Sequence, residues 1–275
     1  MNTWSLCMAA FVLIAGLGHP AHATLLARDL NNDSVTDAYY DTVLDVTWLR
    51  DANLISNNNF GLSYGVDLGD HPADNDGPNS NYIFSSGRAT WGGAMHWIDA
   101  MNVASYLGYS NWRLPKIVDT GIVGCDYGYG GTDCGFNVET IEAITNPPTI
   151  YSELAYMYYV NLDNKGTIDI NGAIQSGSGL VNDPDNPNDE SLFLNVQQGS
   201  AYWSGSEYLP YIYAAWYFHM VDGYQSAYGK SSNLFVWALR DGDAATIPEP
   251  ESLGLVGLGL VGLAWFRMQP RQSRK

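Results

Sequence analysis

The chain has 275 residues, and 46% of them are hydrophobic, which is too apolar for a disordered protein and predicts a folded one. Only 15% are charged, while 29 Gly, 19 Tyr and 9 Trp favour short strands, tight turns and aromatic packing over long charged helices. The formal net charge of -17 would repel phosphate backbones, so a nucleic-acid partner is excluded, whereas cationic partners and metal ions stay open.

The N-terminus has the features of a secretory signal peptide. An apolar run over residues 9–17 precedes the small-x-small triplet Ala21-His22-Ala23, which signal peptidase accepts. We therefore predict cleavage between Ala23 and Thr24, so that residues 1–23 are removed. A buried core strand is the less favoured alternative for this run.

Oxygen-bearing side chains then recur with the spacing of a calcium loop. Asp29, Asn31, Asp33 and Asp37 stand at relative positions 1, 3, 5 and 9. The match is partial, because Ser34 replaces the turn glycine and a tyrosine occupies position 12. Calcium is thus a candidate cofactor with these four residues as its candidate ligands, although Asx turns are the commoner reason for such a run.

Residues 39–49 are rich in β-branched and aromatic side chains and predict a strand or hairpin. A Gly/Asn/Asp-rich loop follows from 57 to 86. It contains Gly61-Leu62-Ser63-Tyr64-Gly65, which matches the serine-hydrolase elbow but lacks the flanking strand and helix that the elbow requires. The acidic stretch 67–76, like another at 183–190, offers its carboxylates either to a hard cation or to solvent.

An amphipathic helix is predicted at residues 90–101, because apolar residues lie at 91, 94, 95, 98 and 101 and Thr90 is a favourable N-cap. The helical pattern ends before the segment Asn111-Trp112-Arg113-Leu114-Pro115. We interpret Trp112 and Arg113 as scaffold, with the guanidinium buried and fully hydrogen-bonded. A second short helix is predicted from Val138 to Thr145.

The cysteines indicate one disulfide. Cys7 leaves with the signal peptide, and Cys125 and Cys134 remain as an even pair in an exported chain. Closing a loop of about ten residues contributes at most roughly 3 kcal/mol, which pins a loop but does not hold a domain together. A zinc site is less favoured, because no second Cys/His pair accompanies these two residues.

Alternating strands are predicted at residues 201–206, 215–221, 224–228 and 234–240, with Asp222-Gly223 as a hairpin turn. Trp203, Trp216 and Trp237 lie in these strands with period-2 spacing, which is more typical of core residues than of sugar platforms. The whole pattern predicts an α+β domain with an antiparallel sheet and one or two short helices.

The C-terminus combines three signals. Pro248-Glu249-Pro250 is followed by the apolar run Leu253 to Phe266 and then by a basic tail. Fourteen residues span only ~21 Å as a helix against a bilayer core of ~30 Å, which predicts a short transmembrane anchor. Residues 248–275 resemble the PEP-CTERM sorting signal of Gram-negative bacteria. That resemblance implies transient anchoring in the inner membrane, cleavage near Pro-Glu-Pro by an exosortase, and release to the cell surface or extracellular matrix. A permanent anchor is the alternative.

Removal of both ends leaves residues 24–247, which we predict to form one domain. Eight basic and 27 acidic residues remain in it, a net charge of -19. The mature protein is therefore more acidic than the full chain.

Four blocks of this domain together resemble the Lcl C-terminal domain family, named after a bacterial collagen-like adhesin. They are DTVLDVTW at 41–48, a Thr-Trp-initiated helix leading to NWRLP at 111–115, YWSGS at 202–206, and residues 215–243, which end in VWALRDGD. The family motif residues, which we interpret as structural, are Trp48, Trp91, Trp112, Arg113, Leu114, Pro115, Trp203, Trp216, Trp237 and Arg240. The resemblance implies a C-type-lectin-like fold, and the family's best-known member binds sulfated glycans.

These observations favour an exported, non-catalytic surface or matrix protein that binds extracellular polysaccharide. The charge of -19 disfavours sulfated glycans, so neutral polysaccharide, or acidic polysaccharide bridged by calcium, is expected. The alternative is a hydrolase or modifying enzyme on the same scaffold, which a His or carboxylate pair converging in a pocket would indicate. A structural matrix protein without a specific ligand is the third interpretation.

Overall fold

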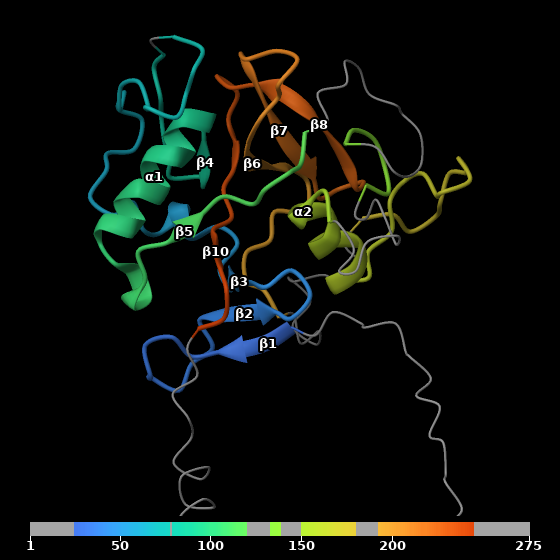
Figure 1. The fold of residues 1–275 in the computed structure, drawn as a ribbon, viewed down its shortest axis with the longest axis horizontal. Helices are drawn as coiled ribbons and strands as arrows, with labels where there is room; N and C mark the ends of the chain where they lie inside the picture. The colour runs from blue at the N-terminus through green and yellow to red at the C-terminus, as the bar shows by residue number, and fades with distance from the viewer. Residues whose placement is uncertain (1–24, 78, 120–132, 139–149, 180–191, 245–275) are drawn as a thin grey trace, which may run out of the picture.

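The computed structural model describes residues 25–77, 79–119, 133–138, 150–179 and 192–244. Within them the chain forms two five-stranded sheets and a few helical segments, which confirms the α+β class (Figure 1). The strands are β1 Leu25–Arg28, β2 Ala38–Asp41, β3 Val46–Leu49, β4 Arg88–Ala89, β5 Trp112–Arg113, β6 Ala201–Glu207, β7 Ala214–His219, β8 Tyr224–Gly229, β9 Leu234–Phe235 and β10 Leu239–Asp241. The helices are α1 Trp91–Val103 and α2 Glu153–Tyr156, with the 3-10 turns η1 Leu54–Ser56 and η2 Tyr106–Gly108 and the π turn η3 Met157–Asn161.

The first sheet has the order β1-β2-β3-β10-β5, and all of its neighbouring strands are antiparallel. The hairpin predicted at residues 39–49 is confirmed as β2 and β3, in which Ala38 pairs with Leu49 and Asp41 with Val46. Asp41 Oδ1 accepts the backbone N–H groups of Val43 and Leu44, so the side chain of the last β2 residue shapes the turn. The hairpin therefore rests on a local signal that the sequence displays.

The second sheet has the order β4-β9-β6-β7-β8. The hairpin of β7 and β8 is confirmed, with His219 paired to Tyr224 across the turn that contains Gly223. The purely antiparallel prediction is wrong in one place, because β6 and β9 pair in parallel at Tyr202 and Phe235. This parallel pairing joins segments that lie far apart in the chain, so no local sequence pattern predicts it.

The single strand predicted at residues 234–240 is also corrected. The chain pairs as β9 in one sheet, crosses between the sheets at residues 236–238, and pairs again as β10 in the other (Figure 1). Side chains along this segment alternate between two hydrophobic cores: Phe235, Trp237 and Leu239 enter one, and Val236 and Ala238 enter the other. The crossing segment is buried on both sides, as its continuous apolar sequence requires.

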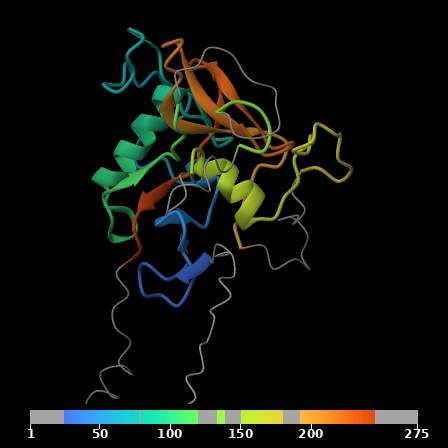
Figure 2. The ribbon, with the colours of Figure 1, turned by 45° about the vertical axis from the view of Figure 1, so that its right-hand side comes forward.

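The two cores lie on opposite sides of the central strands. One contains Trp48, Tyr202 and Trp237 and is closed by α2 and η3, whereas the other contains Trp97, Trp112 and Trp203 and is closed by α1. Figures 1 and 2 show α1 and α2 flanking these strands from different sides.

The helix predicted at residues 90–101 is confirmed as α1. Thr90 is its N-cap, and its Oγ1 accepts the backbone N–H of Gly93 at 3.2 Å. The helix α2 was not predicted. Its N-cap Ser152 accepts the N–H of Ala155 at 3.1 Å, and η3 continues it. The second predicted helix, 138–145, falls almost entirely outside the described residues.

No helix in the described part of the chain is long and apolar enough to cross a membrane. The predicted signal peptide and the Pro248-Glu249-Pro250 tail with its apolar run lie outside the described ranges. The structure itself therefore tests neither of them.

The start of α1 packs against backbone, which gives a stability test. A Cβ added at Gly93 would lie 2.2 Å from the carbonyl oxygen of Tyr82, closer than van der Waals contact allows. We expect Gly93→Ala to lower the free energy of unfolding by about 1–3 kcal/mol despite alanine's better helix propensity. The matched control is Gly229→Ala, because a Cβ there meets nothing within 4 Å and should change stability by less than about 0.5 kcal/mol. Urea denaturation of both variants decides this, and equal stabilities would contradict the close approach.

Candidate functional site

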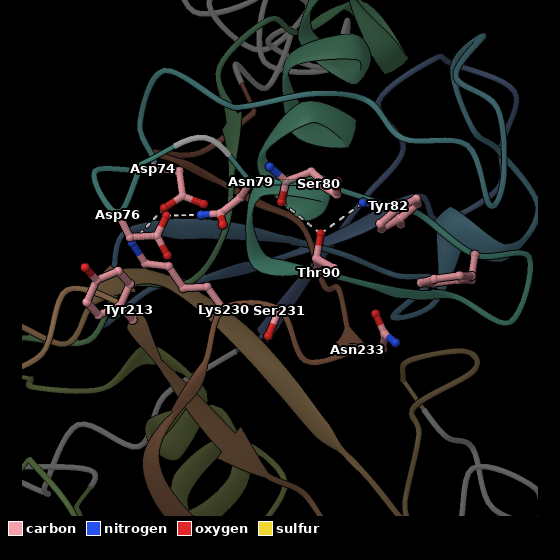
Figure 3. Close-up of a pocket in the computed structure, with 12 residues that line it drawn as sticks. Asp74, Asp76, Asn79, Ser80, Tyr82, Thr90, Tyr213, Lys230, Ser231 and Asn233 are labelled. Atoms are coloured by element: carbon pink, nitrogen blue, oxygen red, sulfur yellow. Dashed lines mark hydrogen bonds and ion pairs between the residues drawn. The ribbon is translucent and has the colours of Figure 1, made fainter.

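A cavity of about 540 Å³ opens where the loop before β4 meets the segment that follows β8 (Figure 3). Carboxyl groups and Tyr213 lie at one end of it, and Tyr82 lies at the other. Its lining is mostly polar with a few aromatic rings: Asp74, Asp76, Asn79, Ser80, Asn81, Tyr82, Phe84, Thr90, Tyr213, Lys230, Ser231 and Asn233.

The wall of the cavity contains a buried ion cluster around Lys230. The Lys230 ammonium donates to Asp74 Oδ1 at 2.8 Å and to Glu207 Oε1 at 2.7 Å, and it lies 4.7 Å from the ring centroid of Trp91. Burial would lower the pKa of Lys230, but the bonds to Asp74 and Glu207 outweigh it and raise the pKa instead. The ammonium is therefore charged, and it ties the acidic loop to the second sheet.

Two carboxyl groups meet beside this ammonium. The Asp74 side chain is only 1% exposed, and the Asp76 carboxyl is hydrogen-bonded to it. Partial burial, followed by the adjacent Asp74 carboxylate, raises the pKa of Asp76 to about 6, against the weaker opposing effect of Lys230. Asn79 Nδ2 donates to Asp76 Oδ1 (Figure 3). The pair thus carries more negative charge than Lys230 neutralises.

Aromatic rings border the polar lining. Tyr82 and Phe84 are half-buried, with ring centroids 6.2 Å apart and planes inclined by 28°. Tyr213 is 50% exposed and belongs to the loop between β6 and β7. The cavity therefore offers apolar ring faces beside carboxylate, amide and hydroxyl groups.

Local hydrogen bonds fix the loop that carries the acids. A hydrogen bond from the Ser80 side chain, followed by the backbone N–H groups of Gly69 and Asn81 that donate to Asp67 Oδ1, lowers the pKa of Asp67. Asn81 Nδ2 donates to the carbonyl of Gly69, and Thr90 Oγ1 donates to Asn81 Oδ1. The helix cap of α1 and the loop therefore share one network.

His71 fastens the same loop to α1. It is buried, its Nε2 lies 3.0 Å from Asp99 Oδ2, and its Nδ1 accepts the N–H of Ala73. Both ring nitrogens are engaged, so His71 has no free nitrogen to act as a general base. Ser63 of the G-x-S-x-G match lies in a loop, as the sequence indicated.

Asp74 and Asp76 form a carboxylate pair in the cavity, and such a pair is the feature that would indicate an enzyme. Glycoside hydrolysis needs its two carboxyl groups about 5 Å or more apart, so that they flank the scissile bond. Asp74 and Asp76 instead contact each other, and Asp74 Oδ1 is already bonded to Lys230. The pair fits charge binding better than that chemistry.

The residues of the predicted calcium site, Asp29, Asn31, Asp33 and Asp37, lie in the loop between β1 and β2, and the site stays a prediction from the sequence. Asp29 accepts the N–H groups of Asp33 and Ser34, and Asp33 accepts that of Val35. These side chains shape the loop between β1 and β2 as Asx turns. Across the described ranges, no three His, Cys, Asp or Glu side chains are placed to hold a metal ion.

Cys134 is buried and belongs to a disulfide. Its sulfur lies 3.4 Å from the carbonyl oxygen of Gln225 in β8. The predicted partner, Cys125, lies outside the described residues, so the pairing of the two stays a prediction. The processing residues Ala23, Thr24, Pro248, Glu249 and Pro250 also lie outside them.

The ten family motif residues pack in the interior or join elements of the fold. Each of the motif tryptophans is at most 2% exposed, and most of their indole N–H groups donate to backbone carbonyls, as Trp237 does to Leu49 at 2.8 Å. Arg113 donates to both carboxylate oxygens of Glu153 and to Asp241, joining β5, α2 and β10. Arg240 is buried and lies 4.1 Å from the ring centroid of Tyr109. Leu114 and Pro115 are buried as well.

Comparison with known families shows to which family the domain belongs. The Lcl C-terminal domain pattern matches residues 37–240, which is most of the chain. The chain belongs to the Lcl C-terminal domain family. A PEP-CTERM protein-sorting motif matches residues 246–267, so this Lcl C-terminal domain protein carries an exosortase-dependent export signal of the Gram-negative cell envelope. No curated protein and no solved structure is significantly similar to it.

The sequence located one part of the cavity and missed the rest. It offered the acidic stretch 67–76 either to a hard cation or to solvent, and in the structure Asp74 of this stretch is bonded to the side chain of Lys230. Lys230 stood inside a family block without an assigned role. Tyr213 and Asn233 carried no signal, because nothing in their local sequence distinguishes a cavity rim from an ordinary loop.

The Asp76 carboxyl gives a pH-dependent prediction. Its pKa of about 6 in the fold exceeds the unfolded value of about 3.9, so the folded state binds the proton more tightly and loses stability as the pH rises through 4 to 6. Asp76→Asn keeps an acceptor for Asn79 and removes the charge. It should therefore raise the melting temperature at pH 7.5 and leave it unchanged at pH 4.5.

The control for this change is Asp163→Asn. Asp163 is exposed in a turn with φ 51°, a conformation that asparagine tolerates well. This variant changes the net charge equally and should melt like the parent at both values of pH. Lower stability of Asp76→Asn at pH 7.5 would contradict the repulsion between Asp74 and Asp76.

Proposed function

We propose that this protein is a non-catalytic surface or matrix protein that binds extracellular polysaccharide through the cavity beside Lys230. The observation that supports the proposal is the combination, in one cavity of about 540 Å³, of aromatic ring faces with carboxylate, amide and hydroxyl groups. Sugars present C–H faces to rings and hydroxyl groups to polar side chains, and this volume is in the usual range for small-ligand sites. The α+β arrangement is compatible with the C-type-lectin-like fold that the family resemblance implies, and we propose that fold for the domain.

The charge of the cavity restricts the ligand. Asp74, Asp76 and Glu207 face a single cation, Lys230, so sulfated or uronate-rich glycans would meet net negative charge. We therefore propose a ligand without negative charge. This differs from the sulfated glycans that the family's best-known member binds.

An enzymatic role is the alternative, and we propose that it does not apply. Both ring nitrogens of His71 are bonded, and Asp74 and Asp76 contact each other, so these described residues do not provide separated acid and base groups. Release of reducing sugar from a bound polysaccharide would overturn this proposal. A structural matrix protein without a ligand is the remaining outcome.

Removing one ring from the cavity tests the binding proposal. We expect Tyr213→Ala to weaken binding of the mature protein to neutral polysaccharide by about tenfold, because ring stacking contributes roughly 1 kcal/mol or more. Tyr228→Ala is the matched control, since Tyr228 is 54% exposed in β8 and does not line the cavity. Affinity electrophoresis in gels that contain defined polysaccharides measures both, and equal retardation of parent and Tyr213→Ala would remove Tyr213 from the site.

We further propose that the protein is anchored briefly in the inner membrane and then released by exosortase. Secreted or surface-bound protein should lack both residues 1–23 and the apolar run with its basic tail, because the sorting motif at 246–267 directs that cleavage. Intact mass spectrometry of the surface and medium fractions measures the two termini. An unprocessed C-terminus in those fractions would defeat the release step and favour a permanent anchor.

A further inference from the structure

The loop between β6 and β7 exposes a cluster of apolar side chains. Leu209 is 64% exposed and Tyr211 is 58% exposed, and Ile212 and Tyr213 are exposed beside them. None of the residues 208–213 has a charged side chain. Single exposed apolar residues are normal on a protein surface, whereas contiguous ones mark a place where something binds. We call residues 209–213 the apolar loop.

Hydrogen bonds and ring packing tie the apolar loop to the second sheet. The N–H of Leu209 donates to Asp119 Oδ2 at 2.7 Å, and the indole N–H of Trp216 donates to the same oxygen at 2.8 Å. The Tyr208 ring packs edge-on against Trp216 with centroids 5.1 Å apart, and the N–H of Tyr211 donates to the carbonyl of Tyr208 at 2.9 Å. The loop backbone is thus ordered before a ligand arrives, which lowers the entropy cost of binding on it.

Tyr213 joins the apolar loop to the cavity beside Lys230. Its ring lines the cavity, and the centroid of the Tyr211 ring lies 5.2 Å from it with the two planes inclined by 60° (Figure 3). Its carbonyl accepts the N–H of Lys230 at 3.0 Å, so the loop is bonded to the residue whose side chain lies in the cavity wall. Tyr211 is therefore the apolar surface that a ligand meets when it leaves the cavity past Tyr213.

We propose that the apolar loop extends the cavity into a longer site that binds several consecutive units of a neutral polysaccharide chain, not a single sugar unit. The proposal rests on the polysaccharide-binding function and names the part of the polymer that is recognised. One unit would pack on Tyr213 at the mouth of the cavity, and a following unit would pack on Tyr211. The apolar rings would contact the C–H faces of these units, while their hydroxyl groups stay in water.

Charge disfavours the other partners that an apolar surface could bind. A second copy of this chain would bring the same strongly negative net charge against the first, and an anionic membrane would be repelled in the same way. A neutral glycan chain meets no such repulsion. The continuity of the apolar loop with the polar cavity also favours a ligand that has both apolar faces and hydroxyl groups.

The test measures how affinity depends on the length of the sugar chain. The secreted protein is titrated by calorimetry with monomers, dimers, tetramers and hexamers of β-1,4-linked glucose, β-1,4-linked mannose and α-1,4-linked glucose. In the series that binds, we expect the hexamer to bind at least about tenfold more tightly than the dimer. Tyr211→Ala should weaken binding of the hexamer by about tenfold and leave that of the dimer unchanged, because the cavity alone holds the dimer.

Two further variants serve as controls. Tyr211→Phe keeps the ring and should bind every oligomer as the parent does. Tyr228→Ala removes a tyrosine of similar exposure that lies outside both the apolar loop and the cavity, and it should also leave the affinities unchanged. Tyr211 is exposed, so its replacement should leave the melting temperature close to that of the parent.

The outcomes separate this proposal from the function on which it rests. Equal affinity of the parent for dimer and hexamer, or unchanged hexamer binding in Tyr211→Ala, would overturn the extended site and retain binding in the cavity. An equal loss for dimer and hexamer in Tyr211→Ala would mean damage to the cavity and would also overturn it. Absence of binding by all three series and by their polymers would overturn the polysaccharide function itself.

Two measurements on the same variants exclude other partners of the apolar loop. Sedimentation of the parent should show a monomer, and the protein should not sediment with phosphatidylcholine vesicles. A dimer that Tyr211→Ala dissociates would make the loop a contact between two copies. Vesicle binding that the same variant abolishes would make it a membrane contact, and either result would overturn the extended sugar site.

Discussion

The fold depends on the segment that crosses between its two sheets. Trp237 lies at the middle of this crossing, fully buried, with its indole N–H bonded to Leu49 and its ring 5.0 Å from both Trp48 and Phe193. Val236 and Ala238, on either side of it, face the opposite core. One extended segment thus fixes the distance between the sheets, because neither core can change volume without moving the other.

The packing of the two sheets also determines where the cavity beside Lys230 lies. Lys230 directly follows β8, only a few residues before the crossing, and its carbonyl accepts the N–H of Trp91 at the start of α1. Its side chain reaches Asp74 in the loop and Glu207 at the end of β6. The backbone and side chain of one residue therefore connect the helix, the loop and the sheet around the cavity, so the position of the acids follows from the packing of the sheets.

Local signals in the sequence predicted the local parts of this structure. The hairpin at 39–49 and the helix capped by Thr90 follow from residue types and spacing alone. The division of 234–240 between two sheets, the parallel contact of β6 with β9, and the pairing of Lys230 with Asp74 across 156 residues depend on long-range contacts. The acidic stretch 67–76 was interpreted as either a hard-cation ligand or a solvated loop, and no sequence pattern shows that a lysine of the same chain pairs with it. The four-residue calcium pattern stays a prediction, since its spacing also satisfies the Asx turns that the loop contains.

The scarcity of cations explains why the cavity is acidic. The mature chain has eight basic residues, and several of them join distant segments. Arg28 pairs with Asp243, Arg113 with Glu153 and Asp241, and Arg240 bonds to Asn111 over the Tyr109 ring. Each such pair removes a cation from the surface that could otherwise attract an anionic ligand. Arg28, Arg113 and Arg240 thus join elements of the fold, and Lys230 is the cation among the described residues that line the acidic cavity.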